Sequence, residues 1–356
     1  MRLVLPGLFD LQVNGFGGID FNAADLTADR AVEALELMRR TGVTRCLPTL
    51  ITGPFDQFAS NARAIARASH PAIAGIHMEG PYVSPADGAR GAHPRAYVAP
   101  ASIDDFARRQ DAAAGRIVLV TLAPEVPGAI PLIEYLVAAG VRVAIGHTDA
   151  TPLEIGDAVR AGATLATHLG NGCPQMLPRH PNVIWELLGA DTLYASIIVD
   201  GHHLPPATVK SMIRAKGLDR TILVTDAIAA AASAPGRYTV GGVECELGAD
   251  GRVSLPGTPY LAGSSLTLDR AIANTVRFTG LPIDVVAPMA STIPAAYMGM
   301  TTVGTVTAEW DPDAGDLRIL DVACRTEDRS MSRPSEGGAS SAEARSVSRP
   351  SEGGTP

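Results

Sequence analysis

Cysteine is scarce in this chain of 356 residues, which has only four cysteines and no CxxC pair. Their wide spacing argues against a zinc finger or a dithiol redox motif. Scattered thiols suit a reducing cytoplasm better than a secreted protein stapled by disulfides. No apolar run reaches the roughly 18 residues of a membrane span, and no segment has the pattern of a signal peptide. We therefore expect a cytoplasmic protein that does not cross a membrane.

Positive charge is also limited. Lys and Arg number 29 against 37 Asp and Glu, so the net charge is −8. This balance argues against a nucleic-acid partner. Charged residues make up only 19 % of the chain and apolar residues 46 %, so the chain can bury a large core. The length suits one large barrel or two ordinary domains.

Short apolar segments rich in β-branched residues alternate with longer helical segments along most of the chain. Strands that are buried on both faces of a parallel sheet have such near-continuous apolar runs. Eight strand–helix units predict an α/β fold, a (β/α)8 barrel, with a doubly wound open sheet as the alternative. The expected strands are 8–12, 43–49, 73–78, 116–122, 141–146, 163–167, 194–199 and 221–225. The expected helices include 28–40, 55–68, 128–139, 151–161 and 205–215.

Two later segments break this alternation. Residues 233–262 carry Gly-Gly and Asp-Gly turn signals, which predict a β insertion after the eighth strand. Residues 301–324 predict another hairpin, and we expect the two to form one small β domain against the barrel. The expected domains are a barrel over 7–300 with the insertion at 233–262, a remnant of a small β domain from 1–6 and 301–325, and a tail over 326–356.

The tail has its own composition. The segment RSMSRPSEGG returns as RSVSRPSEGG, and Ser, Gly, Pro and Arg dominate. Such a composition lacks the apolar residues needed to pack a core, so we expect the tail to be disordered.

Polar side chains stand where the expected strands end. Chemistry in a (β/α)8 barrel takes place at the C-terminal ends of its strands. Each side chain alone is explained by an ordinary hydrogen bond or a helix cap, but their convergence from several strands predicts a site. They are Gln12 and Asn14, His77 and Glu79, His147, His168, Asp200 with His202 and His203, and Asp226.

These residues include the components of a metal-dependent hydrolase. Glu79, His147 and His168 supply two imidazoles and a carboxylate, a common zinc set that leaves one position open. A metal held there would lower the pKa of water and polarise a carbonyl. Asp226 is placed to act as the general base, and His203 to stabilise an oxyanion.

In their order and spacing, the motifs of this chain resemble the N-acetylglucosamine-6-phosphate deacetylases of the amidohydrolase superfamily. The resemblance runs from about Leu5 to Gly304. It implies a hydrolase of linear amide bonds that converts N-acetylglucosamine 6-phosphate to glucosamine 6-phosphate and acetate in amino-sugar catabolism. The matching stretches are PGLFDLQVNGFGGIDF, GIHMEGPYVSP, GAHPRAY, GHTDAT, THLGNG, IIVDGHHL, LVTDA, LAGSSLTLDRAI and STIPAAYMG.

The resemblance also implies the metal content. Members of this family often carry Gln-x-Asn on the first strand in place of His-x-His, as Gln12 and Asn14 do here. Amide oxygens are poor zinc ligands beside imidazole or carboxylate. We therefore expect one divalent ion, Zn²⁺ first and Fe²⁺ or another ion as alternatives. Gln12 and Asn14 then become second-shell or polar lining residues.

The remaining roles are carried over from the resemblance position by position. Asp226 resembles the catalytic acid and base, and His203 the histidine that polarises the acetyl carbonyl, while His202 stands where the family is commonly apolar. Asn171 and Gly172 are expected to contact the sugar phosphate. Arg179 matches an arginine that reaches the phosphate across a homodimer interface. The further substrate-binding positions are Ala92, His93, Leu261, Ala262 and Gly263.

Two departures from the family keep alternatives open. The usual loop His-Leu-Phe-Asn-Ala-Met is replaced here by HLGNGC, and the chain starts close to the first barrel strand. The same chemistry on N-acetylgalactosamine 6-phosphate, or on an unphosphorylated N-acyl compound, is therefore the first alternative. A catalytically silent barrel with a binding role is the second. The expected partners are a small amino-sugar phosphate and a second copy of the chain, without nucleic acid or membrane.

Overall fold

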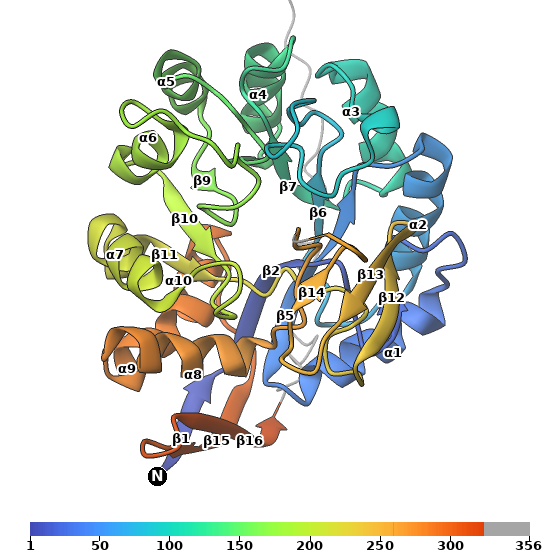
Figure 1. The fold of residues 1–356 in the computed structure, drawn as a ribbon. Coiled ribbons are helices and arrows are strands. Elements are labelled where there is room, and N and C mark those ends of the chain that lie inside the picture. The colour runs from blue at the N-terminus through green and yellow to red at the C-terminus, as the bar shows by residue number, and fades with distance from the viewer. Residues whose placement is uncertain (259, 324–356) are drawn as a thin grey trace, which may run out of the picture. The chain divides into compact units, whose positions relative to one another are not determined.

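A barrel of eight parallel strands forms the centre of the protein (Figure 1). The computed structural model describes residues 1–258 and 260–323. The strands follow one another around the sheet in chain order, which excludes the strand reversal of a doubly wound sheet and confirms the (β/α)8 prediction. They are β2 (Leu8–Val13), β5 (Val43–Ile51), β6 (Ile76–Glu79), β7 (Ile117–Leu122), β8 (Arg142–Ile145), β9 (Leu165–Ala166), β10 (Tyr194–Ile197) and β11 (Thr221–Leu223).

The barrel closes where β2 meets the end of β11. Val13 and Ala227 form a parallel bridge at this seam. Just beside it, the backbone N–H of Asp226 donates to the Gln12 carbonyl at 2.9 Å, and that of Asn14 donates to the Ala227 carbonyl at 2.7 Å. The seam therefore brings together the polar residues predicted at the ends of the first and eighth strands.

Buried strands make up the core, and one carboxyl group is buried among them. All six residues of β2 are buried, as parallel strands covered on both faces require. Its Asp10 accepts a hydrogen bond from the Thr225 hydroxyl at 2.5 Å, which ties β2 to the segment after β11. Burial raises the pKa of Asp10 from 3.8 to about 7.

Helices surround the barrel (Figure 1). α5 shows how the sequence sets their limits, because Thr151 and Glu154 form a capping box, Pro152 occupies the first turn, and Gly162 ends the helix in the left-handed conformation. The main helices are α1 (Ala28–Arg39), α2 (Phe55–Arg67), α3 (Ile103–Ala112), α4 (Ala129–Ala138), α5 (Pro152–Ala161), α6 (Val183–Gly189), α7 (Pro206–Lys216) and α8 (Leu268–Thr279). Shorter segments are α9 (Ile283–Val286), α10 (Thr292–Tyr297), η1 (Arg95–Tyr97), η2 (Leu218–Arg220) and η3 (Ala287–Ala290).

Three small sheets complete the described fold. One has the order β1-β15-β16, another β12-β13-β14, and the third joins β3 to β4. Both predicted hairpins are present, and they lie in different sheets. β1, within the expected segment 1–6, pairs antiparallel with β15 of the C-terminal hairpin. The bounds are β1 (Arg2–Pro6), β3 (Gly15–Phe16), β4 (Ile19–Asp20), β12 (Gly236–Val240), β13 (Val243–Leu247), β14 (Val253–Ser254), β15 (Thr305–Asp311) and β16 (Asp316–Ala323).

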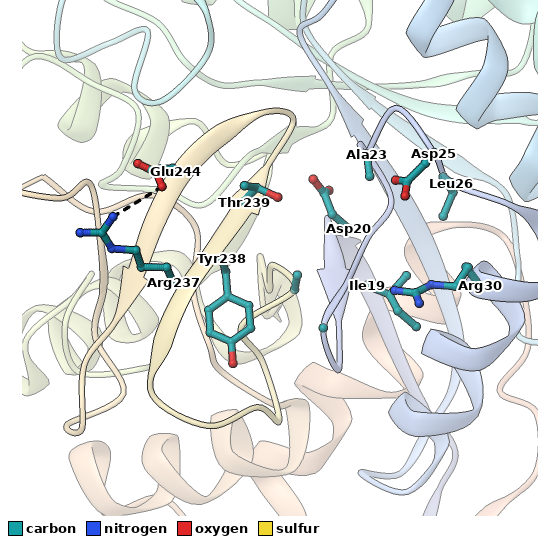
Figure 2. A pocket seen from close by; sticks show the side chains of 12 residues that line it. Ile19, Asp20, Ala23, Asp25, Leu26, Arg30, Arg237, Tyr238, Thr239 and Glu244 are labelled. Carbon is teal, nitrogen blue, oxygen red and sulfur yellow. Dashed lines mark ion pairs between the residues drawn. The ribbon is translucent and has the colours of Figure 1, made fainter.

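The β12–β13 hairpin is fastened to the barrel side by a buried carboxylate. Asp20, at the end of β4, accepts a hydrogen bond from the backbone N–H of Gly241 in the hairpin turn at 2.9 Å. A cleft of about 540 Å³ lies beside this contact, between the β3–β4 hairpin, the start of α1 and the β12–β13 hairpin (Figure 2). Arg237 and Glu244 form an ion pair across the hairpin there. None of the predicted site residues lines this cleft.

Two further expectations concern the C-terminal tail and membrane-spanning helices. The expected disordered tail, 326–356, lies outside the described residues. No helix within 1–258 or 260–323 is long and apolar enough to cross a bilayer. The division of the chain into domains stays a prediction.

Candidate active site

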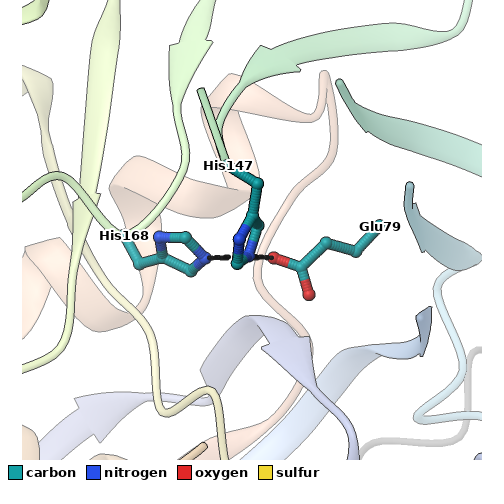
Figure 3. A group of neighbouring side chains, drawn as sticks. All are labelled: Glu79, His147 and His168. Atoms are coloured by element: carbon teal, nitrogen blue, oxygen red, sulfur yellow. Dashed lines mark hydrogen bonds and ion pairs between the residues drawn. The ribbon is translucent and has the colours of Figure 1, made fainter. Parts of the chain in front are cut away.

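Three predicted ligands meet at the mouth of the barrel (Figure 3). Glu79 ends β6, while His147 and His168 each stand two residues beyond the ends of β8 and β9. The Nε2 atoms of His147 and His168 lie 3.1 and 3.0 Å from Oε1 of Glu79, and 3.0 Å from each other. All three side chains are buried.

Unusual backbone conformations set the direction of several side chains at the barrel mouth. His147, His168 and Asp226 have positive φ angles of 50°, 31° and 49°. Residues other than glycine seldom adopt this region, and such strain is typical of functional sites. Each of these residues stands just after a strand. The left-handed turn there directs each side chain across the barrel mouth.

The donor set fits a divalent metal ion. Nitrogen and oxygen ligands held about 2.0–2.1 Å from a tetrahedral ion lie roughly 3.3 Å apart, close to the separations found here. Two imidazole N–H groups facing each other at 3.0 Å would repel, whereas two lone pairs can share one cation. The Nδ1 atom of His147 lies 3.1 Å from the Ala89 carbonyl. If Nδ1–H donates there, the Nε2 lone pair is left for a metal.

Glu79 is held as a carboxylate. Burial opposes its charge, but the hydrogen bonds and charges of His147 and His168 hold the pKa of Glu79 well below its usual value. The Gln12 amide adds a hydrogen bond from Nε2 to Oε1 of Glu79 at 2.8 Å. Gln12 therefore holds the Glu79 carboxylate in place from outside the cluster of Glu79, His147 and His168.

Asp226 lines the same cleft as the ligand cluster and contacts the second amide of the Gln-x-Asn motif. Nδ2 of Asn14 donates to Oδ1 of Asp226 at 2.7 Å. Burial, followed by the charge of Glu79, raises the pKa of Asp226 to about 6. A carboxyl group with this pKa can accept and return a proton near neutral pH.

A cleft of about 1090 Å³ opens above the ligands. Glu79, His147, His168, Asp226 and His203 all line it. The structure thus brings together the metal-ligand and catalytic residues predicted from five different strands. The cleft is also lined by the predicted substrate residues Ala92, His93, Asn171, Gly172, Leu261 and Gly263, and by Asn14.

Two predicted substrate residues lie outside this lining. Ala262 is only 1 % exposed and packs with the apolar residues of the β12–β14 sheet. Arg179 is exposed on the surface, in the segment that leads into α6. A single copy of the chain therefore does not place the Arg179 side chain in its own cleft.

His93 is turned toward the ligand cluster. Its Nε2 lies 3.1 Å from Nε2 of His147, and its Nδ1 lies 2.7 Å from the Thr52 hydroxyl. Burial, followed by the neighbouring His147, lowers the pKa of His93 to about 3. The ring is therefore neutral at physiological pH and borders the ligand end of the cleft.

Two other histidines singled out at strand ends do not enter the site. His77 lies in the barrel interior, where its Nε2 is 2.7 Å from the Thr121 hydroxyl. Burial lowers the pKa of His77 to about 4. His202 turns away from the cleft and places its Nε2 3.2 Å from the Asp250 carbonyl. Both have ordinary structural contacts.

Sequence reasoning missed two contacts of the site. Asp200 was singled out at the end of the seventh strand without a role, and the structure pairs it with His203. Arg90 was not considered, and it lines the cleft while donating to the His93 carbonyl at 2.7 Å. The Asp-x-x-His spacing of Asp200 and His203 is a signal that could have identified the first contact, because a short acidic side chain accepts from nearby backbone N–H groups.

Comparison with known proteins identifies the family. A family model described as "Amidohydrolase family" matches residues 3–315. The chain belongs to the amidohydrolase family. Its placement in that family agrees with the barrel and with the ligand cluster at the barrel mouth.

Several curated proteins are similar to this amidohydrolase. A Rattus norvegicus N-acetylglucosamine-6-phosphate deacetylase is 35 % identical over 341 residues, covering 90 % of this chain and 80 % of that protein. The Bacillus subtilis (strain 168) protein of the same name is 32 % identical over 351 residues, covering 94 % and 86 %. A Shewanella sp. (strain ANA-3) protein named N-acetylgalactosamine-6-phosphate deacetylase is 32 % identical over 339 residues, covering 90 % and 81 %.

Solved structures also resemble this amidohydrolase. N-acetyl-D-glucosamine-6-phosphate deacetylase from Mycobacterium smegmatis is 32 % identical with a TM-score of 0.83, covering 91 % of this chain and 86 % of that one. A mutant of the same enzyme, 31 % identical, was solved in complex with N-acetyl-D-glucosamine-6-phosphate.

Proposed function

We propose that this amidohydrolase removes the acetyl group of N-acetylglucosamine 6-phosphate and releases glucosamine 6-phosphate and acetate. One observation carries the proposal: Glu79, His147, His168, Asp226 and His203 meet in one cleft. Relatives and solved structures that carry this name support the choice of substrate. A phosphorylated sugar is retained inside cells, so we place the reaction in the cytoplasm.

The ligand cluster would hold one divalent ion through Glu79, His147 and His168. Two imidazoles and one carboxylate suit Zn²⁺, and Fe²⁺ is the alternative. When bound, such an ion polarises a carbonyl oxygen and lowers the pKa of water.

Asp226 is proposed to move the proton. Its carboxylate accepts a proton from the water that attacks the acetyl carbon, and the C–N bond then breaks as Asp226 returns this proton to the amine nitrogen. Water supplies the second oxygen of acetate and the proton that the amine gains. Asn14 orients Asp226 for both transfers through its hydrogen bond to Oδ1.

His203 is proposed to stabilise the acetyl oxygen. A donor aimed at an oxygen that gains negative charge in the transition state lowers the barrier. His203 lines the cleft together with Asp226 and the ligand cluster. A substrate whose nitrogen meets Asp226 can therefore direct its acyl oxygen toward the His203 ring.

The remaining cleft residues are proposed to bind the sugar. The backbone and side chains of Asn171, Gly172 and Ala92, with the segment 261–263, would contact the ring and phosphate. His93 borders the ligand end, so we assign it to the acyl side of the substrate. At Gly170 of the altered loop, a Cβ would lie 2.9 Å from the end of Met212 and 3.0 Å from the end of Leu204, so a larger residue there requires these two side chains to shift.

A homodimer would complete the phosphate site. Arg179 is exposed outside its own cleft, and Met176 and Trp185 nearby are 89 % and 53 % exposed. Exposed apolar side chains mark a protein-binding surface where they form a contiguous patch with a polar rim. We propose that a second copy covers this face and that each copy extends Arg179 into the other's cleft, where its guanidinium would pair with phosphate.

N-acetylgalactosamine 6-phosphate is the second candidate substrate. The Shewanella relative that carries this activity in its name is 32 % identical, as is the Bacillus relative named for the glucosamine sugar. The two sugars differ at one ring hydroxyl. Discrimination therefore depends on residues of the sugar end of the cleft and leaves the hydrolytic chemistry unchanged.

The deciding experiment measures acetate release by zinc-loaded protein. N-acetylglucosamine 6-phosphate, its galactosamine counterpart and unphosphorylated N-acetylglucosamine are compared side by side, with His168→Ala as the inactive control. We expect the highest kcat/KM with the first. Higher kcat/KM with another substrate would overturn the substrate assignment. No release from any of them, with the metal bound, would favour a silent barrel and overturn the enzymatic proposal.

A further inference from the structure

A buried carboxylate fastens the turn of the β12–β13 hairpin to the barrel. Asp20 is only 7 % exposed. Its Oδ2 accepts a hydrogen bond from the backbone N–H of Gly241 in that turn at 2.9 Å, and its Oδ1 accepts one from the backbone N–H of Asn22 at 2.8 Å. Figure 2 shows the Asp20 side chain turned from the β3–β4 hairpin toward the β12–β13 hairpin. Each carboxylate oxygen therefore holds a different segment of the chain.

Asn22 continues this anchor into the barrel. Its Nδ2 donates to the Thr49 carbonyl at 3.0 Å, and its Oδ1 accepts from the backbone N–H of Ile51 at 2.9 Å. Both partners belong to β5, and Ile51 at the end of this strand lines the cleft above the predicted metal ligands, which we call the active cleft. The hairpin turn is thus tied through Asp20 and Asn22 to a barrel strand that borders the active cleft.

The hairpin itself forms part of the wall of the active cleft. Val240 directly precedes Gly241 and lines the active cleft. Thr239, one residue earlier on β12, lines the cleft of about 540 Å³ beside Asp20, which we call the outer cleft. Successive side chains of a strand point to opposite faces. β12 is therefore a wall shared by the two clefts.

Backbone pairing connects this wall to the segment assigned to the sugar. β13 pairs antiparallel with β14, and Ser254 of β14 forms an antiparallel bridge with Leu261. Leu261 and Gly263 line the active cleft, while Ala262 between them packs in the apolar cluster of the same sheet. A displacement of the turn at Gly241 is therefore passed along the sheet to the residues proposed to contact the substrate.

The outer face of the hairpin borders open space. The outer cleft lies between this face, the β3–β4 hairpin and α1, and the hairpin lines it with Arg237, Tyr238 and Glu244 (Figure 2). A strand that borders a cleft gains less from packing than a strand inside a filled core. The hydrogen bond from Gly241 to Asp20 lies on this side of the sheet, so it decides where the turn is held.

We propose that Asp20 is a positioning residue that sets the affinity for substrate: its carboxylate holds the β12–β13 hairpin, and through β14 the segment 261–263, against the sugar end of the active cleft. The inference rests on the proposed amide hydrolysis. Asp20 is not among the described residues that line the active cleft, so its effect on the reaction passes through the sheet that it holds. The predicted metal ligands and Asp226 stand on the barrel, so the chemical step should change little.

Asp20→Asn is the most informative variant, because it keeps the size of the side chain. Its amide oxygen can still accept from one of the two backbone N–H groups, but its NH2 group is only a donor and cannot accept from the other. One of the two attachments is therefore lost. We expect KM for N-acetylglucosamine 6-phosphate to rise about 5- to 30-fold, less than the full effect of losing a hydrogen bond to a charged group, because the apolar cluster still packs. The value of kcat should change less than about threefold.

Asp25→Asn is the matched control. Asp25 is an exposed carboxylate five residues further along the chain, and it lines the outer cleft together with Asp20. The same change of charge is made there without removing the acceptor of the Gly241 N–H. We expect KM and kcat of Asp25→Asn to equal those of the wild type. A KM that rises equally in both variants would assign the effect to the charge of this region and overturn the proposal.

Amide hydrogen exchange of the zinc-loaded protein, followed by mass spectrometry, reports on the anchor without any substrate. Asp20→Asn should speed exchange about tenfold in peptides that cover β12 and β13, because a released turn opens more often. Peptides that cover β7 should exchange at the wild-type rate, and Asp25→Asn should match the wild type in both. Unchanged exchange in the hairpin of Asp20→Asn would overturn the proposal. Faster exchange in β7 as well would reveal a general loss of structure and overturn it too.

Calorimetric binding of N-acetylglucosamine 6-phosphate distinguishes this proposal from the function beneath it. If Asp20→Asn speeds exchange in the hairpin and weakens binding, while no tested substrate releases acetate with the wild type, the role of Asp20 stands and the hydrolytic function fails. If the wild type releases acetate and Asp20→Asn keeps the wild-type KM, the function stands and the role of Asp20 is refuted. A loss confined to kcat would also refute it.

Discussion

The hydrogen bond from Asn14 to Asp226 should set the pH at which the enzyme becomes active. Nδ2 of Asn14 donates to Oδ1 of Asp226 at 2.7 Å within a buried site. A donor to a carboxylate stabilises its ionised form and so lowers its pKa. Asn14→Ala removes this donor and leaves Asp226 in a site where burial already raises its pKa to about 6.

The size of the effect follows from the energy of such a bond. A hydrogen bond to a charged group contributes about 1.5–3 kcal/mol, and each pKa unit corresponds to about 1.4 kcal/mol. Losing it should raise the pKa of Asp226 by about one to two units. At the pH where half of wild-type Asp226 is ionised, the ionised fraction in the variant would be between roughly a tenth and a hundredth, so kcat/KM should fall about 5- to 50-fold there. At pH 9 most of Asp226 is ionised in both proteins, and this part of the difference should largely disappear.

The assay is the pH dependence of kcat/KM for acetate release between pH 5 and 9. A cation bound at Glu79 lowers the pKa of Asp226, and with it the midpoint pH of the acid limb, in wild type and variant alike. The measured quantity is therefore the difference between the midpoint pH of the variant and that of the wild type. Asn171→Ala is the matched control, because Asn171 is an amide in the same cleft whose Nδ2 instead donates to the His168 carbonyl. Any change in its kcat/KM should be the same at every pH, and the acid limb should stay in place.

One result would refute this reasoning. If Asn14→Ala lowers kcat/KM by the same factor at every pH and keeps the wild-type acid limb, Asn14 does not control the ionisation of Asp226. The acid limb must then belong to another group.

Three further predictions concern the base, the ligands and the core. Asp226→Asn should lower kcat by about 100-fold or more with metal content unchanged, and full activity would exclude Asp226 as the base. His168→Ala should lose bound zinc on elemental analysis, and full occupancy would contradict the ligand set. Asp10 has a pKa of about 7 in the fold against an ordinary 3.8. Because the folded carboxyl binds its proton more tightly, its contribution to stability falls as pH rises from about 4 to 7, by up to about 4 kcal/mol. Urea unfolding of Asp10→Asn should therefore show a smaller loss of stability over this range, and parallel curves for the two proteins would contradict the prediction.

The location of the site could be predicted from the sequence, but the contacts within the site could not. Glu79, His147, His168 and Asp226 could be placed together because parallel barrel strands all end at one mouth. The directions of the side chains of His147, His168 and Asp226 depend on positive φ angles at these residues. No local residue pattern predicts such angles for histidine or aspartate. The contact of Asp200 with His203 likewise depends on how one loop folds back on itself.

The pairing of strands in the small sheets likewise could not be predicted from local sequence patterns. Turn signals predicted both hairpins, since a two-residue turn is a local feature. The pairing of β1 with β15 joins segments more than 290 residues apart, and that of the β12–β14 strands stays within one segment. Which edges meet depends on the finished barrel, so turn signals predict the hairpins without predicting the sheets in which they lie.

The β12–β14 sheet has a consequence for how such enzymes diversify. It enters the chain between β11 and α8, and its strands and loops give Val240, Leu255, Tyr260 and Leu261 to the lining of the cleft. The predicted metal ligands and Asp226 belong to the barrel strands and the turns that follow them. Substitutions in this one insertion can therefore reshape what enters the cleft while the hydrolytic apparatus is inherited intact, so that new substrates can arise in evolution without the loss of catalysis in between.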